Sequence, residues 1–232
     1  MTNTPAVLRG YCYVWDMSIR HGTAGKTLRN KLLILMAFLL IVGVGGYLLI
    51  RLFVPLLAPA APILALFLVV RMLSSKEVSR TIRALGKGYL GEMTVGKHLE
   101  QLPTGWRVFH DLDLGGENVD HLVIGPAGIF NVEVKNYSGK VIATPRGLYN
   151  KGQRQDEVVK QAWRQSHRLR EIFGVEVKPI LVFVGDQLEG DRVGKLPVKR
   201  PDELLSYFKG LPKVWEYAEF IAVVRKAEQL VK

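Results

Sequence analysis

Two acidic side chains and one lysine stand in a pattern that suits chemistry on phosphate esters. Asp120 lies in the apolar run 119–124, and Glu133 and Lys135 stand at the end of the next apolar run, 129–134. A Gly-Pro-Ala-Gly turn joins the two runs, so together they predict a β-hairpin. Side chains two residues apart on a strand share a face, so Glu133 and Lys135 point the same way. The hairpin can then bring Asp120 close to both.

Two carboxylates beside a lysine at one sheet edge predict the metal site of a phosphodiesterase. Mg²⁺ prefers hard oxygen ligands, and it keeps several waters while one or two carboxylates bind it. A lysine in such a site orients the attacking water or offsets the charge that grows on the phosphate. We therefore expect Asp120 and Glu133 to hold Mg²⁺ or Mn²⁺, and Lys135 to act on the water. The alternative for each residue taken alone is a surface ion pair.

The rest of the chain from residue 89 onward predicts the elements that position these residues. Residues 74–103 look helical, with Ser74 or Ser75 able to cap the start, and a Gly-Lys-Gly sequence at 86–88 indicates a flexible joint just before residue 89. Helices alternate with strands along this part of the chain, which predicts an α/β fold in which helices cover a mixed sheet. The predicted elements are a helix at 92–102, three or so antiparallel strands between 106 and 144, a small hairpin at 146–150, a helix at 156–173, a buried strand at 177–184, a short helix at 202–208 and a C-terminal helix at 214–231.

The predicted helix at 156–173 carries a second candidate surface. Lys160, Arg164 and Arg168 stand four residues apart on one face, where they could touch the phosphates of a nucleic acid. A solvated charged face is the more common reason for such a stripe. His121 follows Asp120 directly and should point to the opposite face of the strand, which indicates a structural role. No Gly-rich phosphate loop is present, so the sequence does not indicate ATP use.

The N-terminal part of the chain is strongly apolar. Residues 32–50 and 52–70 are two runs of 19 residues without a charge, separated only by Arg51. Each approaches the ~20 apolar residues that a membrane-spanning helix needs, so they predict a transmembrane helical hairpin at 32–73. Pro55, Pro59 and Pro62 would kink the second helix or place the turn later than Arg51. A packed core hairpin of a soluble protein is the alternative.

The net charge of +11 lies mostly beside this apolar region. Residues 1–31 and 71–88 each carry an excess of four positive charges, while residues 89–232 hold 21 basic and 19 acidic residues. Basic flanks mark the cytoplasmic side of a membrane and attract anionic lipid headgroups. The high pI of about 9.8 is therefore weak support for nucleic-acid binding.

These observations divide the chain into five predicted parts. They are a basic cytosolic tail at 1–31, the transmembrane hairpin at 32–73, a basic juxtamembrane linker at 74–88, the domain that carries the candidate site at 89–212, and a C-terminal helix at 213–232.

Three stretches of the chain together resemble the nuclease-related domain family, NERD. They are GEMTVGKHLEQLPTGWRVFHDLDL, NVDHLVIGPAGIFNVEVKNYSGKV, and KQAWRQSHRLREIFG with PILVFVG, and the resemblance covers roughly residues 89–208. It implies a restriction-endonuclease-like fold with a D…(D/E)-x-K active site. By this resemblance Asp120, Glu133 and Lys135 match the metal-and-lysine triad. Glu92 matches an acidic residue from the first helix, and Gln161 matches a polar position that completes such sites. Val119 stands where the wider superfamily has a proline, which has no ligand role.

We weigh three functions from the sequence. The first is a nuclease that depends on Mg²⁺ or Mn²⁺ and acts on nucleic acid, with DNA favoured over RNA. It would be a multi-pass protein of the cell (inner) membrane, in contact with the lipid bilayer, with both termini and the NERD-like domain in the cytoplasm. The second is a non-catalytic nucleic-acid-binding or protein-interaction module on the same anchor, which the near-neutral charge of residues 89–232 favours. The third is a membrane structural protein. A homo-oligomer is considered for each.

Overall fold

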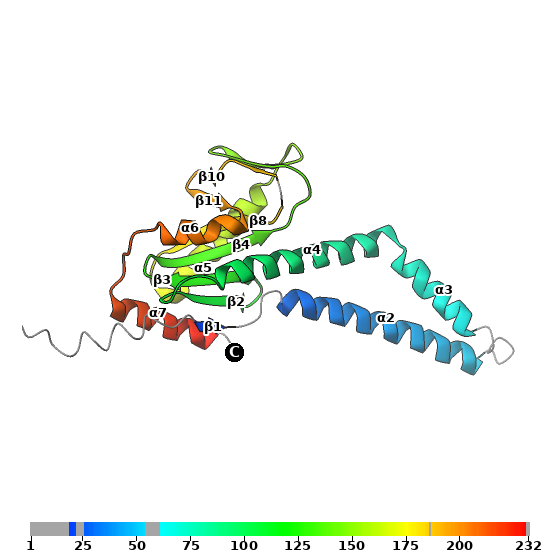
Figure 1. Ribbon diagram of the computed structural model, residues 1–232. Coiled ribbons are helices and arrows are strands. Elements are labelled where there is room, and N and C mark those ends of the chain that lie inside the picture. The colour runs from blue at the N-terminus through cyan, green and yellow to red at the C-terminus, as the bar shows by residue number, and fades with distance from the viewer. Residues whose placement is uncertain (1–18, 22–25, 54–60, 186, 231–232) are drawn as a thin grey trace, which may run out of the picture. The chain divides into compact units, whose positions relative to one another are not determined.

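A computed structural model describes residues 19–21, 26–53, 61–185 and 187–230 (Figure 1). The chain divides into two compact units, Lys26–Tyr89 and Leu90–Lys232, and the second includes the short strand β1 (Ile19–His21). Most of the predicted basic tail at 1–31 falls outside the described residues, and β1 was not predicted.

The first unit is built from apolar helices. Helix α2 (Lys26–Phe53) contains a segment, Arg29–Leu49, that is long and apolar enough to cross a membrane, with a mean hydropathy of 2.7. Most of its large apolar side chains are exposed, as Leu40 and Ile41 are, so the segment is not the core helix of this unit. Helix α2 continues through Arg51, and the predicted turn therefore does not lie there.

Among the described residues, the second apolar run contributes only a short helix. Helix α3 (Ala61–Leu73) has 13 residues. At 1.5 Å per residue it is about 20 Å long, less than the ~30 Å thickness of a bilayer's hydrocarbon core. Pro55 and Pro59 lie outside the described residues. Among the residues that the structure describes, α2 alone has the length and composition of a span, so the second crossing remains a prediction.

The juxtamembrane linker at 74–88 is mostly helical, in line with the helix predicted over 74–103. Helix α4 (Lys76–Leu99) runs without interruption through Gly86 and Gly88, where a flexible joint was predicted. Ser75 caps its start as predicted, because its hydroxyl accepts a hydrogen bond of 3.3 Å from the Val78 N–H. The weak helix propensity of two glycines is overridden because regular helix continues on both sides of them.

The second unit is organised around a mixed sheet of seven strands in the order β1-β2-β3-β4-β8-β11-β10. Strands β2, β3 and β4 are antiparallel, and β4 and β8 are parallel. The predicted hairpin and the buried strand are therefore confirmed as β3, β4 and β8. The bounds are β2 (Arg107–Asp113), β3 (Asn118–Gly125), β4 (Gly128–Lys135), β8 (Val177–Phe183), β10 (Arg192–Val193) and β11 (Leu196–Lys199).

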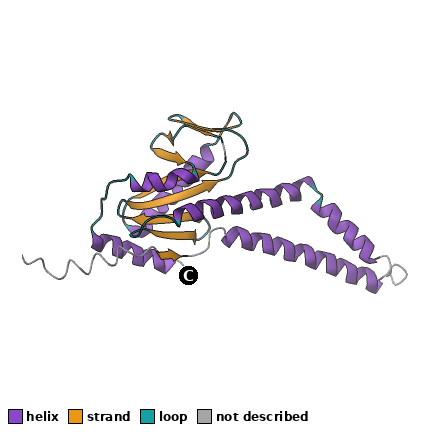
Figure 2. Ribbon diagram, in the orientation of Figure 1, coloured by secondary structure: helices purple, strands orange, loops and turns teal. Residues whose placement is uncertain are grey.

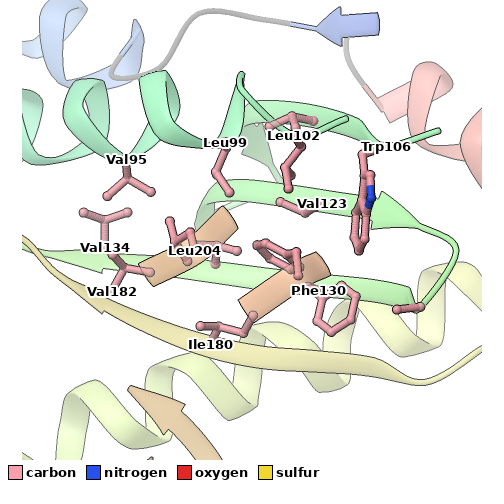
Figure 3. Packing of buried hydrophobic residues seen from close by; sticks show 14 residues of the cluster. Val95, Leu99, Leu102, Trp106, Val123, Phe130, Val134, Ile180, Val182 and Leu204 are labelled. Atoms are coloured by element: carbon pink, nitrogen blue, oxygen red, sulfur yellow. The ribbon is translucent and has the colours of Figure 1, made fainter. Parts of the chain in front are cut away.

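Helices cover both faces of this sheet, which confirms the predicted α/β class (Figure 2). One face packs against the end of α4 and against α6 (Leu204–Lys209), which follows a 3₁₀ turn at Pro201–Glu203. The other face packs against α5 (Asp156–Phe173) and α7 (Tyr217–Leu230). Helix α7 buries Phe220 and Ala227 there, so the predicted separate C-terminal helix shares the core of this unit. Figure 3 shows the cluster under α4 and α6.

A second, smaller sheet lies beside the main one, with the strand order β7-β6-β5-β9. The strand and small hairpin predicted between 140 and 150 are found here rather than in the main sheet. Strand β9 and the neighbouring β10 were not predicted, because two residues are too few to show a period of alternation. The bounds are β5 (Val141–Thr144), β6 (Gly147–Asn150), β7 (Gln153–Arg154) and β9 (Leu188–Glu189).

The end of β3 allows a direct test of this packing. A Cβ atom added at Gly125 would lie 2.1 Å from Cε3 of Trp106, whose ring packs 5.1 Å from that of Phe208. We expect Gly125→Ala to destabilise the domain by about 1–3 kcal/mol, because the indole must shift in a filled core. The measurement is the thermal unfolding midpoint.

Gly86→Ala is the matched control. Nothing lies within 4 Å of the added atom, and the residue is inside α4. Alanine should leave stability unchanged or raise it by up to about 1 kcal/mol, since it is the better helix former. Equal losses in the two variants would contradict both the close contact at Trp106 and the continuity of α4.

Candidate active site

The pairing of β3 with β4 brings the two predicted metal ligands together. His121 pairs with Val132, so the next pair outward joins Asp120 and Glu133. The main chain holds the aspartate in this place, because its Oδ2 atom accepts a hydrogen bond of 2.7 Å from the Val134 N–H. The carboxylates of Asp120 and Glu133 therefore come from opposite strands to one place, as the hairpin predicted.

The lysine and the predicted glutamine complete the cluster. Lys135 Nζ donates to Glu133 Oε1 at 2.5 Å and to Gln161 Oε1 at 3.2 Å. Gln161 comes from α5, which packs across the same face of the sheet. The Glu133 side chain is 1% exposed and the Lys135 side chain 21%, so the cluster is open to solvent on the lysine side.

Three acidic groups act on one another here. Burial raises the pKa of Asp120 well above its ordinary value, and the negative charges of Glu133 and Glu92 raise it further. The Val134 N–H and the charge of Lys135 only partly oppose this rise in pKa. Like charges that are held together in this way favour either a bound proton or a bound cation.

Lys135 is held in its charged form. Burial by itself would lower its pKa, but the charge of Glu133 and the hydrogen bond to it outweigh burial, so the pKa is raised. A lysine with a raised pKa stays protonated at neutral pH and has no free lone pair. It can donate hydrogen bonds to a water or a phosphate oxygen, and it cannot act as a general base.

The oxygen atoms of the cluster fit a hard divalent cation. Glu133 Oε2 is buried and has no hydrogen-bond partner among the described residues. A buried carboxylate oxygen without a partner is costly, and a cation would satisfy it. Within the described ranges no group of three or more His, Cys, Asp or Glu side chains forms a metal cluster. Mg²⁺ does not require one, because one or two carboxylates and several waters are enough.

Glu92 is not a solvated carboxylate at the start of a helix. It is 9% exposed and lies well inside α4, which begins at Lys76. Its charge acts on Asp120, so the helix brings it near the two strand carboxylates. This placement agrees with the acidic position that the resemblance assigned to it.

The cationic stripe on α5 is engaged in contacts of its own. Lys160 pairs with Glu157 at 2.8 Å, and Arg164 Nη2 pairs with Glu117 at 2.7 Å. Arg168 Nη2 donates to the Gly115 carbonyl at 3.3 Å. The contacts of Arg164 and Arg168 tie α5 to the turn between β2 and β3, whereas Lys160 pairs within α5. The role of the stripe in nucleic-acid binding remains a prediction.

A buried polar network beneath the site was not predicted. Asn131, in the middle of β4, donates to the Ala162 carbonyl at 3.1 Å and to Gln165 Oε1 at 3.0 Å. Gln165 Nε2 in turn donates to the Asn118 carbonyl on β3 at 3.0 Å. The network fastens α5, and with it Gln161, to both strands of the site. An asparagine inside an otherwise apolar strand was the available signal.

The histidine next to Asp120 is structural, as predicted. His121 is buried, and its Nδ1 lies 2.8 Å from His110 Nδ1 on the neighbouring strand. Burial lowers the pKa of His121 well below its ordinary value, and the nearby His110 lowers it further. The ring is therefore neutral, on the face of β3 opposite Asp120.

Comparison with known protein families gives one match. The nuclease-related domain family matches residues 87–184. No curated protein matches the chain. Among solved structures, an EndoMS complex with double-stranded DNA is 23% identical over 46% of this chain and 34% of that one, with a TM-score of 0.25. A repair endonuclease from Pyrococcus abyssi is 21% identical over 50% and 39% of the two chains, with a TM-score of 0.27.

A third structure, SfsA from Pyrococcus furiosus in complex with Ca²⁺, is 15% identical over 62% of this chain and 53% of that one, with a TM-score of 0.23. All three alignments span less than two thirds of the other chain. The family assignment accordingly rests on the 87–184 match and its agreement with the quoted motifs. Residues 87–184 of this chain match the nuclease-related domain (NERD) family, over the same stretch that the quoted motifs cover.

Proposed function

We propose that this protein is a nuclease that depends on a divalent metal ion and hydrolyses phosphodiester bonds of nucleic acid, with DNA favoured over RNA. One observation carries the proposal. A buried, unsatisfied oxygen of Glu133 lies beside Asp120, and a protonated lysine and Gln161 complete the same cluster. The cluster belongs to a domain of a nuclease-related family.

Each residue has a distinct part in this proposal. Asp120 and Glu133 would hold Mg²⁺ or Mn²⁺, and Glu92 would add negative charge behind them. When bound, such an ion lowers the pKa of water and offsets negative charge on a phosphate. Lys135 donates to the attacking water or to a phosphate oxygen, and Gln161 holds the ammonium in position. The aspartate must lose its proton before it can act as a ligand.

We further infer that α2 anchors the protein in the cell (inner) membrane. Its segment Arg29–Leu49 has the length and hydropathy of a span, and basic residues stand on both sides of it. The finer form of this proposal is a multi-pass anchor in which residues 52–70 return the chain, so that both termini and the nuclease domain face the cytoplasm.

The first test removes the ammonium. In a cleavage assay with the full-length protein and Mg²⁺ or Mn²⁺, we expect Lys135→Ala to lower the rate at least about 100-fold, because a preorganised donor to the reacting group is lost. Lys135→Arg should retain part of the activity, and EDTA should abolish it in the unmodified protein.

Metal-dependent cleavage that survives Lys135→Ala would contradict the role given to the lysine. Oligonucleotide binding without cleavage under either ion would favour the non-catalytic binding module. If the protein binds neither metal nor nucleic acid, the protein-interaction function is the one that remains.

The second test uses the repulsion between the carboxylates. The pKa of Asp120 is raised by folding, so the ionised form destabilises the folded state. This penalty begins to shrink as pH falls through the folded-state pKa and is gone below the unfolded-state pKa. Without metal, Asp120→Asn should therefore raise the unfolding midpoint by about 2–4 °C for each kcal/mol relieved. We expect Mg²⁺ to raise the unfolding midpoint of the unmodified protein, and this rise should be lost in Asp120→Asn.

Asp191→Asn serves as the control, because its carboxylate is 67% exposed and paired only with Arg192 at 3.5 Å. This change should leave both the midpoint and the metal response unaltered. An equal metal response in Asp120→Asn and in the unmodified protein would remove Asp120 from the ligand set.

A further inference from the structure

The small sheet beside the active site holds the entire positive excess of its domain. The segment 136–155 contains four basic residues and no acidic residue, while the rest of 89–232 holds 17 basic and 19 acidic residues. The near-neutral charge of the domain therefore hides one cationic segment on an otherwise slightly negative surface. The segment forms β5, β6 and β7. Its basic residues are Lys140, Arg146, Lys151 and Arg154.

This segment begins and ends at the candidate active site. Tyr137, two residues after Lys135, packs its ring 5.6 Å from that of Phe183, and its hydroxyl donates to Gln155 Oε1 at 3.5 Å. That bond joins the two ends of the segment. Asn150 Nδ2 donates to the Ser138 and Lys140 carbonyls at 3.3 and 3.2 Å, which fastens the β6–β7 turn to the chain that leaves the site.

The outward face of the small sheet combines an aromatic ring with cations at its edges. Val141, Ala143 and Leu148 point into the core. The opposite face carries Ile142 and Tyr149, which are paired across β5 and β6, and Arg154, which is paired with Tyr149 across β6 and β7. A partly exposed aromatic ring between cations is the arrangement that holds a nucleic-acid strand by stacking and by backbone contacts.

Two of the four cations have no partner among the described residues. Lys140 pairs with Glu189 of β9, and Arg154 pairs with Asp156, but both pairs are exposed and therefore weak. In the described part of the chain, neither the Arg146 nor the Lys151 side chain makes a hydrogen bond or an ion pair. They stand at the two ends of β6, about 16 Å apart at 3.3 Å per residue, a distance of about five nucleotides along one strand of a duplex.

Lys151 also occupies an unfavourable backbone position. It is the first residue of a two-residue turn, with φ 51°, and Gly152 follows with φ 77°. Such a turn favours Asn or Asp at the first position, and a lysine there is uncommon. A strained residue at a surface turn motivates a search for function. Here the side chain supplies a positive charge next to the active site.

We propose that the outward face of the β5–β6–β7 sheet is the subsite that holds the nucleic-acid strand next to the scissile phosphate, with Arg146 and Lys151 as phosphate contacts. This inference rests on the proposed nuclease function, and it differs from the α5 stripe, whose cations already contact Glu157, Glu117 and Gly115. The ligand chemistry is a single polyanionic strand with exposed bases.

The test measures binding separately from cleavage. The full-length protein is titrated into a short fluorescent single-stranded DNA in EDTA, at several salt concentrations. Arg146→Glu with Lys151→Glu should weaken binding at least about tenfold and reduce the slope of log Kd against log salt by about 1.4, since each single-strand phosphate contact contributes about 0.7. The control is Arg225→Glu with Lys226→Glu on α7, which has the same charge change at exposed positions and should bind normally.

Lys151→Asn guards against misfolding as an explanation. Asparagine adopts a positive φ more readily than lysine, so this variant should unfold at the same or a higher temperature while it binds DNA more weakly. Unchanged affinity in the double variant, or an equal loss in the α7 control, would overturn the subsite. A double variant that binds anionic lipid vesicles more weakly but keeps its affinity for DNA would also overturn the subsite.

Failure of the subsite and failure of the nuclease function are distinguishable. Cleavage by the unmodified protein, with full DNA affinity in the double variant, would overturn the subsite alone. DNA binding that depends on Arg146 and Lys151, without cleavage under Mg²⁺ or Mn²⁺, would overturn the nuclease function and leave the subsite in place.

Discussion

The register of one antiparallel strand pair fixes the geometry of the candidate active site. Because His121 pairs with Val132, Asp120 must stand across from Glu133, and a partly buried carboxylate meets a fully buried one. Their repulsion raises the pKa of Asp120, and only one cationic side chain, Lys135, opposes it within the cluster. A shift of one residue in the register would turn the acids to opposite faces and remove the interaction. The rest of the unit serves to hold this register.

Several layers of structure maintain that register. The parallel pairing of β4 with β8 places Glu133 beside Leu181 in the middle of the sheet, where the strand cannot slide. The Asn131–Gln165 network ties α5 to both β3 and β4, so Gln161 reaches Lys135 from a fixed helix. The aromatic cluster of Trp106, Phe130 and Phe208 fills the opposite face near the hairpin turn. A site with destabilising like charges can persist because the surrounding core over-determines its geometry.

Local patterns in the sequence predicted the parts whose signal is local. The β3–β4 hairpin has a turn with clear glycine and proline chemistry between two alternating runs, and α5 has a strong apolar stripe, so both were predicted with nearly correct bounds. The hairpin pattern gave Asp120, Glu133 and Lys135, and the family resemblance added Gln161 on α5. The catalytic roles of these residues remain predictions, since proximity is a necessary condition for catalysis and not a sufficient one.

The parts that the sequence did not predict depend on distant partners or on averaged quantities. Gly86 and Gly88 suggested a joint, but helix on both sides carries α4 through them. β1 is three residues long and exists because β2 offers an edge to pair with. The apolar run 52–70 contains three prolines, and its described part, α3, is shorter than the run. In each case tertiary or positional context outweighed composition.

Predictions of function from net charge fail for the same reason, because local context matters more than composition. A total of +11 suggested a nucleic-acid-binding protein, the location of most of that charge beside the apolar helices argued against it, and the domain's near balance favoured a non-catalytic module. Each of these three inferences used a net charge, although charge is not distributed uniformly over the surface. Electrostatic attraction falls off within about 10 Å at moderate salt, so a bound phosphate responds to the cations close to it and hardly to the average charge of the chain. A nearly neutral domain can therefore hold a polyanion, provided that its few unpaired cations stand beside the chemistry.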